Sequence, residues 1–317
     1  MLKMKKLLLI LSLCSNCFGW QPVSAQETDA TWEAGEAVEA TPENTPRPVT
    51  SVLTLGIGQG KMRDTYLTNL LYEGSATDIT YERWRLMRQC RWNNQQVVDL
   101  SYMKGKDKSK LTTSMAGRVR YQYAMHKVWR LGKPSSLTAE APFSLYVGPY
   151  AALNVGFNYN LKMAGSNNPA TIHLTENFGA SAGAVWHYSL HRQPCALNVQ
   201  VQAPLLGVAM VPEYGASYYE TFYVEDEPET SHVTSLHNQQ DLDVRITTDI
   251  PLATIPFLKK LDTTVRLGFS YHIETMDINH IVTRYSTCQF VVGWTYQYLP
   301  YSRRKSHLLK SQPAYAY

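Results

Sequence analysis

Apolar and polar residues alternate with a period of two in two neighbouring segments near the end of the chain, within residues 262–301. One face of the first segment carries Val265, Leu267, Phe269, Tyr271 and Ile273, and the other face carries Thr264, Arg266, Gly268, Ser270, His272 and Glu274. In the second segment, Phe290, Val292, Trp294, Tyr296 and Tyr298 alternate with Gln289, Val291, Gly293, Thr295 and Gln297. A period of two is that of a β-strand, so the two segments predict a β-hairpin.

The two faces of this hairpin differ in a way that suits a membrane. The apolar face ends in aromatic residues, which are typical of the membrane–water interface, and the other face suits a polar lumen. Beyond the N-terminal region, no run approaches the roughly 18 apolar residues that a spanning helix needs. Within hydrocarbon, strands satisfy all their backbone hydrogen bonds only in a closed barrel. We therefore predict an all-β, transmembrane antiparallel up-and-down β-barrel.

Further segments with the same alternation bring the expected number of strands to about ten. They start near residue 51 and then cover residues 76–88, 95–102, 115–125, 144–158, 178–189, 197–205 and 241–247. The connections at residues 60–78, 104–110, 162–171 and 207–240 are expected to be loops, and residues 191–194 a short turn. An even number of strands places both termini on the periplasmic side. Twelve strands remain an alternative if residues 216–224 join an extra hairpin.

Two of these segments contain features that predict β-bulges. Ile79 and Tyr81 fit one face of the second strand whereas Trp84 fits the other, so a bulge is expected near residues 82–83. Pro149 lies inside the fifth strand and cannot donate a hydrogen bond to a neighbour. We expect a local bulge there as well.

The start of the chain has the layout of a secretory signal peptide. Lysines precede an apolar run at residues 7–13, and Val23 and Ala25 are the small residues of a cleavage site. We therefore expect export to the outer membrane of a Gram-negative cell envelope. The expected organisation is a signal peptide at 1–25, a flexible acidic periplasmic arm at 26–49, the barrel at 50–299 and a basic tail at 300–317.

The net charge and the cysteine content do not indicate a soluble partner. Removal of the signal peptide lowers the formal charge from +4 to about +1, because the peptide carries three lysines and no acid. Nucleic acid is not expected, since no basic stripe is interleaved with aromatic residues. Cys90, Cys195 and Cys288 remain, an odd number without a CxxC motif. We expect them to be isolated, and we expect no metal and no cofactor.

His187 and Ser189 are the first candidate catalytic residues. They lie two apart on one strand, so both side chains point the same way. With Asn198 or Gln200 on the next strand they could form a hydroxyl nucleophile, its base and an orienting amide. Because Trp186 occupies the outward phase, this pair faces the lumen near a periplasmic turn. Two hydrogen-bonded lumen residues are the favoured interpretation.

A second candidate set lies on the eighth and ninth strands and the adjoining loop. It consists of Asp241, Asp243, His272, Glu274 and His280. Carboxylates and a histidine at a barrel mouth could activate water for hydrolysis. The predicted lumen also contains arginines that need carboxylate partners, namely Arg118, Arg120, Arg245 and Arg266. Structural ion pairing is therefore favoured, with Arg245 or Arg266 expected within salt-bridge distance of Asp243 or Glu274.

The long connection at residues 207–240 is the candidate ligand-binding surface. Its aromatic residues are Tyr214, Tyr218, Tyr219, Phe222 and Tyr223. A long ordered loop is uncommon without a use, so these side chains could stack on a ligand, or they could fold inward as a plug. The neighbouring acids Glu225, Asp226, Glu227 and Glu229 lack the ordered spacing of a calcium loop.

Several loop motifs add a resemblance to a known family. They are Asp64-Thr65-Tyr66-Leu67, Ser166-Asn167-Asn168-Pro169-Ala170, Ala203-Pro204-Leu205-Leu206-Gly207 and Pro212-Glu213-Tyr214-Gly215-Ala216-Ser217-Tyr218-Tyr219-Glu220-Thr221-Phe222. Together they resemble a family of exported barrel-like proteins known as domain of unknown function 3316, over about residues 51–298. The resemblance implies an outer-membrane barrel without an assigned activity. The basic tail that follows the last strand departs from barrels that end on an aromatic assembly signal.

From the sequence we expect a structural or ligand-interacting envelope protein with a lumen largely filled by side chains. A ring of about ten strands leaves little room for a pore. A hydrolase of lipase or protease type and a narrow channel for small solutes remain alternatives. The expected partners are outer-membrane lipid, the barrel-assembly machinery during insertion and an unknown small ligand.

Overall fold

The computed structural model describes residues 49–87, 92–132, 142–161, 169–190, 193–211, 231–252 and 264–298. Nearly all of them lie in β-strands, and no helix among them is long and apolar enough to cross a membrane. The strands are β1 (Val49–Asp64), β2 (Thr68–Met87), β3 (Trp92–Asp107), β4 (Thr113–Leu131), β5 (Phe143–Asn160), β6 (Ala170–Leu190), β7 (Gln193–Met210), β8 (Ser231–Ser235), β9 (Gln239–Pro251), β10 (Thr264–Ile278) and β11 (Ile281–Tyr298).

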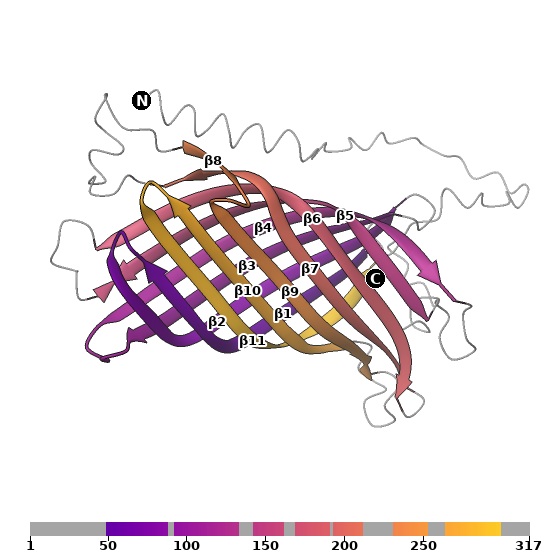
Figure 1. Cartoon of the computed structure of the whole chain (residues 1–317). Coiled ribbons are helices and arrows are strands. Elements are labelled where there is room, and N and C mark those ends of the chain that lie inside the picture. Colours follow the sequence, from indigo (N-terminus) through magenta and orange to yellow (C-terminus); the bar gives the residue numbers. More distant parts are fainter. Residues whose placement is uncertain are drawn as a thin grey trace, which may run out of the picture. The chain divides into compact units, whose positions relative to one another are not determined.

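Ten of these strands close into an antiparallel barrel (Figure 1). The ring runs in the order β6-β5-β4-β3-β2-β1-β11-β10-β9-β7, and pairing between β6 and β7 closes it. β7 has two neighbours on its other side. It pairs with β9 over residues 196–202 and with the short β8 over residues 206–210. The predicted ten-stranded barrel is therefore confirmed. We call the end with Val49 and Tyr298, which lie opposite each other, the terminal end, and the other the far end.

The alternation along β10 and β11 separates the outside of the barrel from the lumen as predicted. Phe269 and Trp294 point outward and are 58% and 53% exposed, whereas Arg266 and Thr295 are buried in the lumen. Phe269 lies directly opposite Phe290, and their rings meet edge to face with centroids 5.4 Å apart. Aromatic cross-strand pairs of this kind stabilise a sheet on the face that they share.

The predicted loop at residues 60–78 is wrong. β1 continues to Asp64 and β2 starts at Thr68, so only a tight turn joins them. Most outward residues of this extension are polar, among them Lys61 and Glu73, and Leu71 is the exception. Apolar alternation therefore stops although the backbone ladder continues, which is expected where a strand projects beyond the hydrocarbon.

The bulge predicted near residues 82–83 is also wrong. β2 stays in continuous register there with both neighbours, from Tyr81 opposite Leu53 to Trp84 opposite Thr50. Trp84 is simply an inward residue, only 2% exposed. A large aromatic side chain that fills the lumen produced the apparent change of phase.

The irregularity predicted at Pro149 is an interruption and not a bulge. The β4–β5 ladder lacks the pairs of Met125 with Pro149 and of His126 with Gly148, but the register is the same on both sides, and pairing with β6 is continuous. A shift occurs instead between Phe178 and Gly179 of β6, where Gly179 faces Pro204 of β7. The proline that accompanies a bulge is thus Pro204. A proline without a donor disturbs a ladder only at positions where its N–H would point to the partner strand.

The long connection predicted at residues 207–240 is shorter than expected. β7 extends to Met210, and β8 leads into β9 through a turn in which Asn238 accepts from the backbone N–H of Ser235 at 2.8 Å. The twelve-strand alternative at residues 216–224 lies outside the described residues. So do the signal peptide at 1–25, nearly all of the arm at 26–49, whose last residue Val49 begins β1, and the tail at 300–317.

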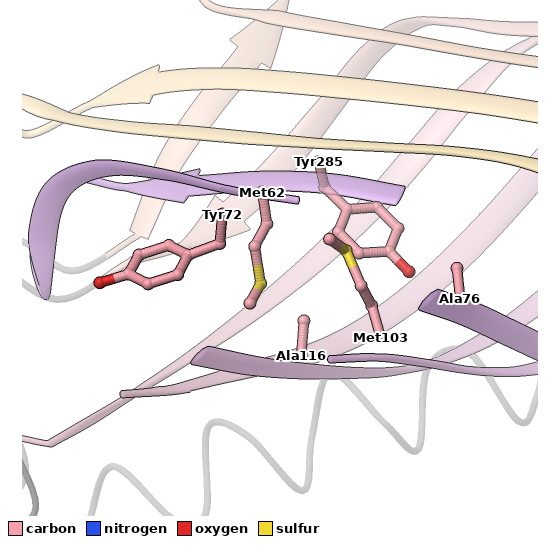
Figure 2. Close-up of a cluster of buried hydrophobic side chains, with 6 residues drawn as sticks. All are labelled: Met62, Tyr72, Ala76, Met103, Ala116 and Tyr285. Carbon is pink, nitrogen blue, oxygen red and sulfur yellow. The ribbon is translucent and has the colours of Figure 1, made fainter. Parts of the chain in front are cut away.

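Apolar side chains form separate layers at the two ends of the lumen. Near the terminal end, the buried cluster consists of Val52, Trp84, Tyr146, Val185 and Ala196. Toward the far end, a second cluster consists of Met62, Tyr72, Ala76, Met103, Ala116 and Tyr285 (Figure 2). Val52 and Met62 lie ten residues apart on β1, a span of roughly 33 Å along a strand. Most side chains in the lumen between these two layers are polar, and Ala124, Tyr150 and Ala152 form a small apolar cluster among them.

Candidate functional site

Inward positions on five strands place ionisable side chains in the middle of the lumen. These residues are Glu82 of β2, Asp99 of β3, Arg118 and Arg120 of β4, Asp243, Arg245 and Asp249 of β9, and Arg266, His272 and Glu274 of β10. Each is at most 9% exposed. We call this set the central charged layer. Buried charges are stable only when they are paired and hydrogen-bonded, so their partners decide what the layer can do.

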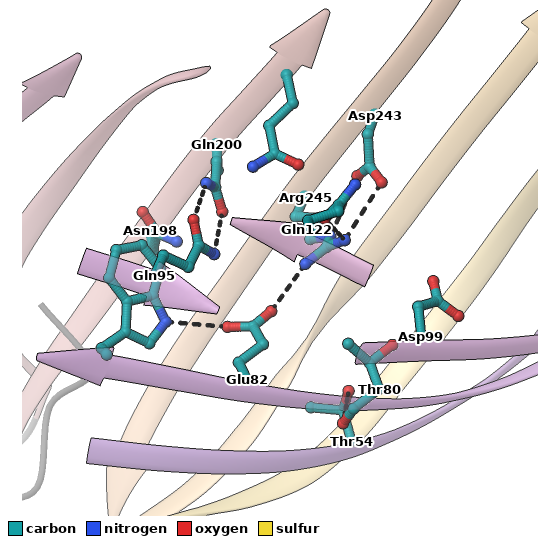
Figure 3. A network of polar contacts seen from close by, with 12 residues as sticks. Thr54, Thr80, Glu82, Gln95, Asp99, Gln122, Asn198, Gln200, Asp243 and Arg245 are labelled. Atoms are coloured by element: carbon teal, nitrogen blue, oxygen red, sulfur yellow. Dashed lines mark hydrogen bonds and ion pairs between the residues drawn. The ribbon is translucent and has the colours of Figure 1, made fainter. Parts of the chain in front are cut away.

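Glu82 is the hub of one half of the central charged layer. Its Oε1 accepts from Arg245 Nη1 at 3.0 Å, and its Oε2 accepts from Arg266 Nη1 at 3.0 Å. The indole N–H of Trp84 also donates to Oε2, at 3.1 Å. One carboxylate thus accepts from three donors on three strands. Figure 3 shows the contact of Glu82 with Arg245 and that of Arg245 with Asp243.

Each of these two arginines also holds a carboxylate on β9 with two nitrogen atoms. Arg266 donates to the two oxygens of Asp249 at 2.7 and 2.8 Å. Arg245 donates to the two oxygens of Asp243 at 3.1 and 3.2 Å, and to Gln122 at 3.2 Å. Two-pronged pairs are the geometrically favoured mode of arginine–carboxylate recognition. The predicted ion pair between Arg245 and Asp243 is confirmed, whereas Arg266 pairs with carboxylates that the sequence did not single out.

Arg120 connects the other candidate acids to His272. Its Nη2 lies 2.7 Å from Asp243 Oδ2 and 3.0 Å from Asp99 Oδ2, and its Nη1 lies 3.1 Å from His272 Nδ1. Asp241 Oδ1 is 3.4 Å from the same ring nitrogen. A guanidinium only donates, so Nδ1 beside it accepts. That nitrogen has no proton left to give Asp241, which is unlike the base-and-orienter arrangement of a hydrolase.

Arg118 neutralises the remaining candidate acid. Its Nη1 lies 3.0 Å from Glu274 Oε2 and 2.5 Å from His173 Nε2, and its guanidinium lies 4.0 Å above the ring of Tyr285. A stacked guanidinium keeps its charge while it packs against the aromatic cluster of the far end. Glu274 is therefore a structural counter-ion in this arrangement.

The space left in the central charged layer is small. A cavity of about 20 Å³ is lined by Asp78, Asp99, Arg118, Arg120 and Glu274 together with neighbouring polar residues. That volume corresponds to a single water molecule, not to a substrate. A second cavity, also of about 20 Å³, is lined by Glu82, Arg245 and Arg266 among others, so each of these two spaces has room for about one water molecule.

His187 and Ser189 differ in their exposure to solvent. His187 is 5% exposed, whereas Ser189 lies near the exposed end of β6. Asn198 accepts from the hydroxyl of Tyr146 at 2.8 Å. Gln200 exchanges hydrogen bonds with Gln95 at 2.6 and 3.1 Å (Figure 3). Both proposed orienting amides are thus engaged by other residues.

The other candidates lie away from the central charged layer. His280 is exposed in the turn between β10 and β11, where Asn279 and His280 have φ values of 53° and 60°. The five aromatic residues of the candidate ligand surface, positions 214–223, lie outside the described residues. In the described part of the chain, Cys195 and Cys288 are free and no group of three His, Cys, Asp or Glu residues is arranged to hold a metal ion.

The sequence reasoning missed Glu82 and the ring cluster beside it. Trp84 stacks on His126 with centroids 5.9 Å apart, and the edge of Tyr146 meets both rings. The alternation along β2 could have revealed that Glu82 points inward, because residues 80, 82 and 84 share one face if the strand is regular. The assumed bulge moved Glu82 out of consideration.

A closed antiparallel barrel with an apolar outer face and a charged lumen defines a transmembrane β-barrel of the outer-membrane class. Residues 6–305 match the family model described as "Protein of unknown function (DUF3316)", and the chain belongs to that family. No curated protein matched the sequence.

Solved structures with a similar fold are bacterial outer-membrane proteins. The outer membrane protease OmpT from Escherichia coli has 7% identity and a TM-score of 0.48, with 80% of this chain and 98% of that chain covered. The translocator domain of the autotransporter NalP from Neisseria meningitidis has 6% identity and a TM-score of 0.32, with 81% and 90% covered. An outer membrane channel from Pseudomonas putida F1 has 7% identity and a TM-score of 0.31, with 83% and 100% covered. At these identities the likeness concerns the fold alone.

Proposed function

We propose that the protein is an outer-membrane barrel with a closed lumen, which serves as a structural or ligand-interacting component of the cell envelope and does not conduct solutes. The observation that carries this proposal is the pairing of Glu82 with Arg245 and Arg266. β2 and β9 are four strands apart in a ring of ten, so these side chains meet across the lumen. A plug made of paired charges is rigid because breaking one pair leaves a buried charge without a partner.

Two further contacts cross the lumen at other positions. Gln95 of β3 meets Gln200 of β7, and Arg120 of β4 meets Asp243 of β9. In both cases the partner strands are four steps apart around the ring. With the apolar layers at the two ends, these contacts support a solid lumen instead of a narrow channel.

Conductance in planar bilayers tests the closed lumen. Folding of the purified barrel is first verified by its heat-dependent migration in gels. We expect no stepwise current from the wild-type protein. A porin reconstituted in the same bilayers shows that the assay detects an open path. Regular current steps from the folded wild-type protein would establish a channel instead.

The ligand-interacting role is assigned to the aromatic segment between β7 and β8. This proposal rests on the composition of residues 214–223 and on their position between two strands that project at the far end. Mass spectrometry of lipids and small molecules that co-purify with the folded barrel tests it. A bound compound should disappear when Tyr218 and Tyr219 are replaced by alanine. Retention of the compound by that variant would show that the binding site lies elsewhere on the protein.

A hydrolase is the second candidate, and the contact between His272 and Asp241 is the observation in its favour. The opposing observation is that Arg120 already donates to the same nitrogen of His272. If His272 is structural, His272→Ala should lower the stability of the barrel, and no hydrolytic activity should depend on this residue. A hydrolytic activity of the wild-type protein that His272→Ala abolishes while the unfolding transition stays in place would favour the enzyme.

A further inference from the structure

We propose that a basic hollow on the outer surface of β2 and β3, at the far end, binds the headgroup of a membrane lipid whose phosphate gives it a net negative charge. This inference rests on the proposed insertion of the barrel into a membrane. It adds a binding site on the outside of the barrel, separate from the lumen.

The hollow begins where the apolar belt of β3 ends. Val98, Leu100 and Tyr102 point outward and are 37%, 48% and 43% exposed. The next outward residues on the same strand are Lys104 and Lys106, both exposed. Two residues advance a strand by roughly 7 Å, so the ammonium groups follow directly on the interfacial tyrosine. That is the level at which lipid headgroups lie.

The lining of the hollow combines apolar and cationic side chains. It has a volume of about 1180 Å³, and its lining includes Leu70, Leu71, Leu111, Lys104, Lys106, Lys108 and Lys110. The three leucines are 46%, 46% and 79% exposed. Exposed leucines beside lysines fit an amphipathic molecule, since acyl carbon can cover the leucines while phosphate meets the ammonium groups.

The carboxylates beside the hollow already have partners. Glu73 forms an ion pair of 2.9 Å with Lys61. Asp107 accepts from the backbone N–H of Thr112 at 2.8 Å and from the hydroxyl of Ser109. Within the described ranges, no carboxylate lies at ion-pair distance from Lys104, Lys106, Lys108 or Lys110. Their charge is therefore available to an anion from outside the chain.

The turn between β3 and β4 holds two of the lysines in place. The hydrogen bonds of Asp107 close the segment up to Thr112, and Lys110 has a φ of 61° within it. A fixed backbone lowers the entropy that Lys108 and Lys110 would lose on binding. Asp107 keeps its negative charge, but the four lysines still outnumber the two carboxylates, Glu73 and Asp107, in the lining of the hollow.

Native mass spectrometry of the folded barrel in detergent, titrated with phosphatidylglycerol or phosphatidylcholine, tests the inference. The wild-type protein should bind phosphatidylglycerol more tightly. The variant Lys104→Gln, Lys106→Gln, Lys110→Gln should weaken that binding by at least about tenfold while it leaves phosphatidylcholine unaffected. The corresponding three Lys→Arg substitutions preserve the charge and should retain the binding.

A charge-matched control separates the hollow from general attraction between charges. The variant Arg83→Gln, Arg85→Gln, Lys127→Gln removes three outward cations at the terminal end and should leave phosphatidylglycerol affinity unchanged. Equal losses in both triple variants, or equal binding of the two lipids, would overturn the site. Displacement of the lipid by millimolar inorganic phosphate would overturn the lipid assignment in favour of a soluble anion. Because folding is checked independently, failure of the barrel to insert is distinguished from failure of this site.

Discussion

Glu82 and Arg245 extend from nearly opposite walls of the barrel and meet at 3.0 Å in the middle of its lumen. Glu82 accepts from Arg266 at the same time, so one carboxylate neutralises parts of two buried guanidinium groups. Removal of one member of a buried ion pair is strongly destabilising because the other charge is left without compensation.

Replacement of Glu82 by glutamine should therefore lower the free energy of unfolding by about 3–5 kcal/mol. Urea titration of the barrel in lipid vesicles, followed by tryptophan fluorescence, measures this change. Glu73→Gln is the matched control, because the ion pair of Glu73 with Lys61 is more than half exposed and should contribute at most about 1 kcal/mol. Similar small effects of both substitutions would show that the lumen is hydrated and that the charges in it are well screened.

Trp84→Ala should destabilise the barrel by about 3–5 kcal/mol, the usual result of truncating a large buried ring. Trp84 is 2% exposed, stacks on His126 and donates a hydrogen bond to Glu82. Trp294→Ala provides the comparison, since Trp294 lies on the outer face and is 53% exposed. Equilibrium unfolding of both variants in the same lipid compares the two effects. A larger loss from Trp294→Ala would mean that contact with lipid outweighs packing in the lumen.

Phe269 and Phe290 should show a coupling free energy of about 0.5–1.5 kcal/mol in a double-mutant cycle with alanine. Their rings lie opposite each other in register and meet edge to face. Unfolding free energies of the two single variants and the double variant yield this coupling. Strictly additive single effects would indicate that lipid separates the two rings.

The turn between β3 and β4 should lose its order in strong acid. Hydrogen bonds from the hydroxyl of Ser109 and the backbone of Thr112 lower the pKa of Asp107 to about 2. A carboxyl group with a lowered pKa stabilises the folded state fully above its ordinary pKa of about 4, and this contribution is lost as the pH falls through about 2. The protection of the Thr112 amide, measured as its exchange rate relative to the intrinsic rate at the same pH, should accordingly fall between pH 4 and pH 2.

Asp107→Asn is the control for that experiment, because an amide does not titrate in this range. The exchange of Thr112 in this variant, corrected for the intrinsic rate at each pH, should show no acid transition. An identical acid transition in the variant would assign the effect to another group.

The outer surface of the barrel was predictable from sequence because two constraints coincide there. Residues such as Phe269 and Trp294 must be apolar to meet hydrocarbon, and the pleat requires them at every second position. Where β1 and β2 leave the hydrocarbon, the first constraint is lost, and the strands were mistaken for a loop. The face of Trp84 was not predictable for the opposite reason, since an aromatic side chain fits a packed lumen as well as a membrane.

The centre of the lumen was predictable only in part. Asp243 and Arg245 are two residues apart on one strand, so their shared face follows from the alternation and their ion pair could be expected. The contacts of Arg120 with Asp243 and of Gln95 with Gln200 depend on the stagger of strands around the ring. Alternation determines the face of a residue but not its height relative to a distant strand.

The pairing of β1 with β11 joins the two ends of the barrel domain, Val49 opposite Tyr298. β1 can pair with β11 only after the last strand has been synthesised. Until then the other strands form at most an open sheet. Because of the same adjacency, the chain could start at another turn without a change in the neighbours of any strand. A circular permutant that links Tyr298 to Val49 and opens the turn at residues 108–112 would preserve every neighbour in the ring.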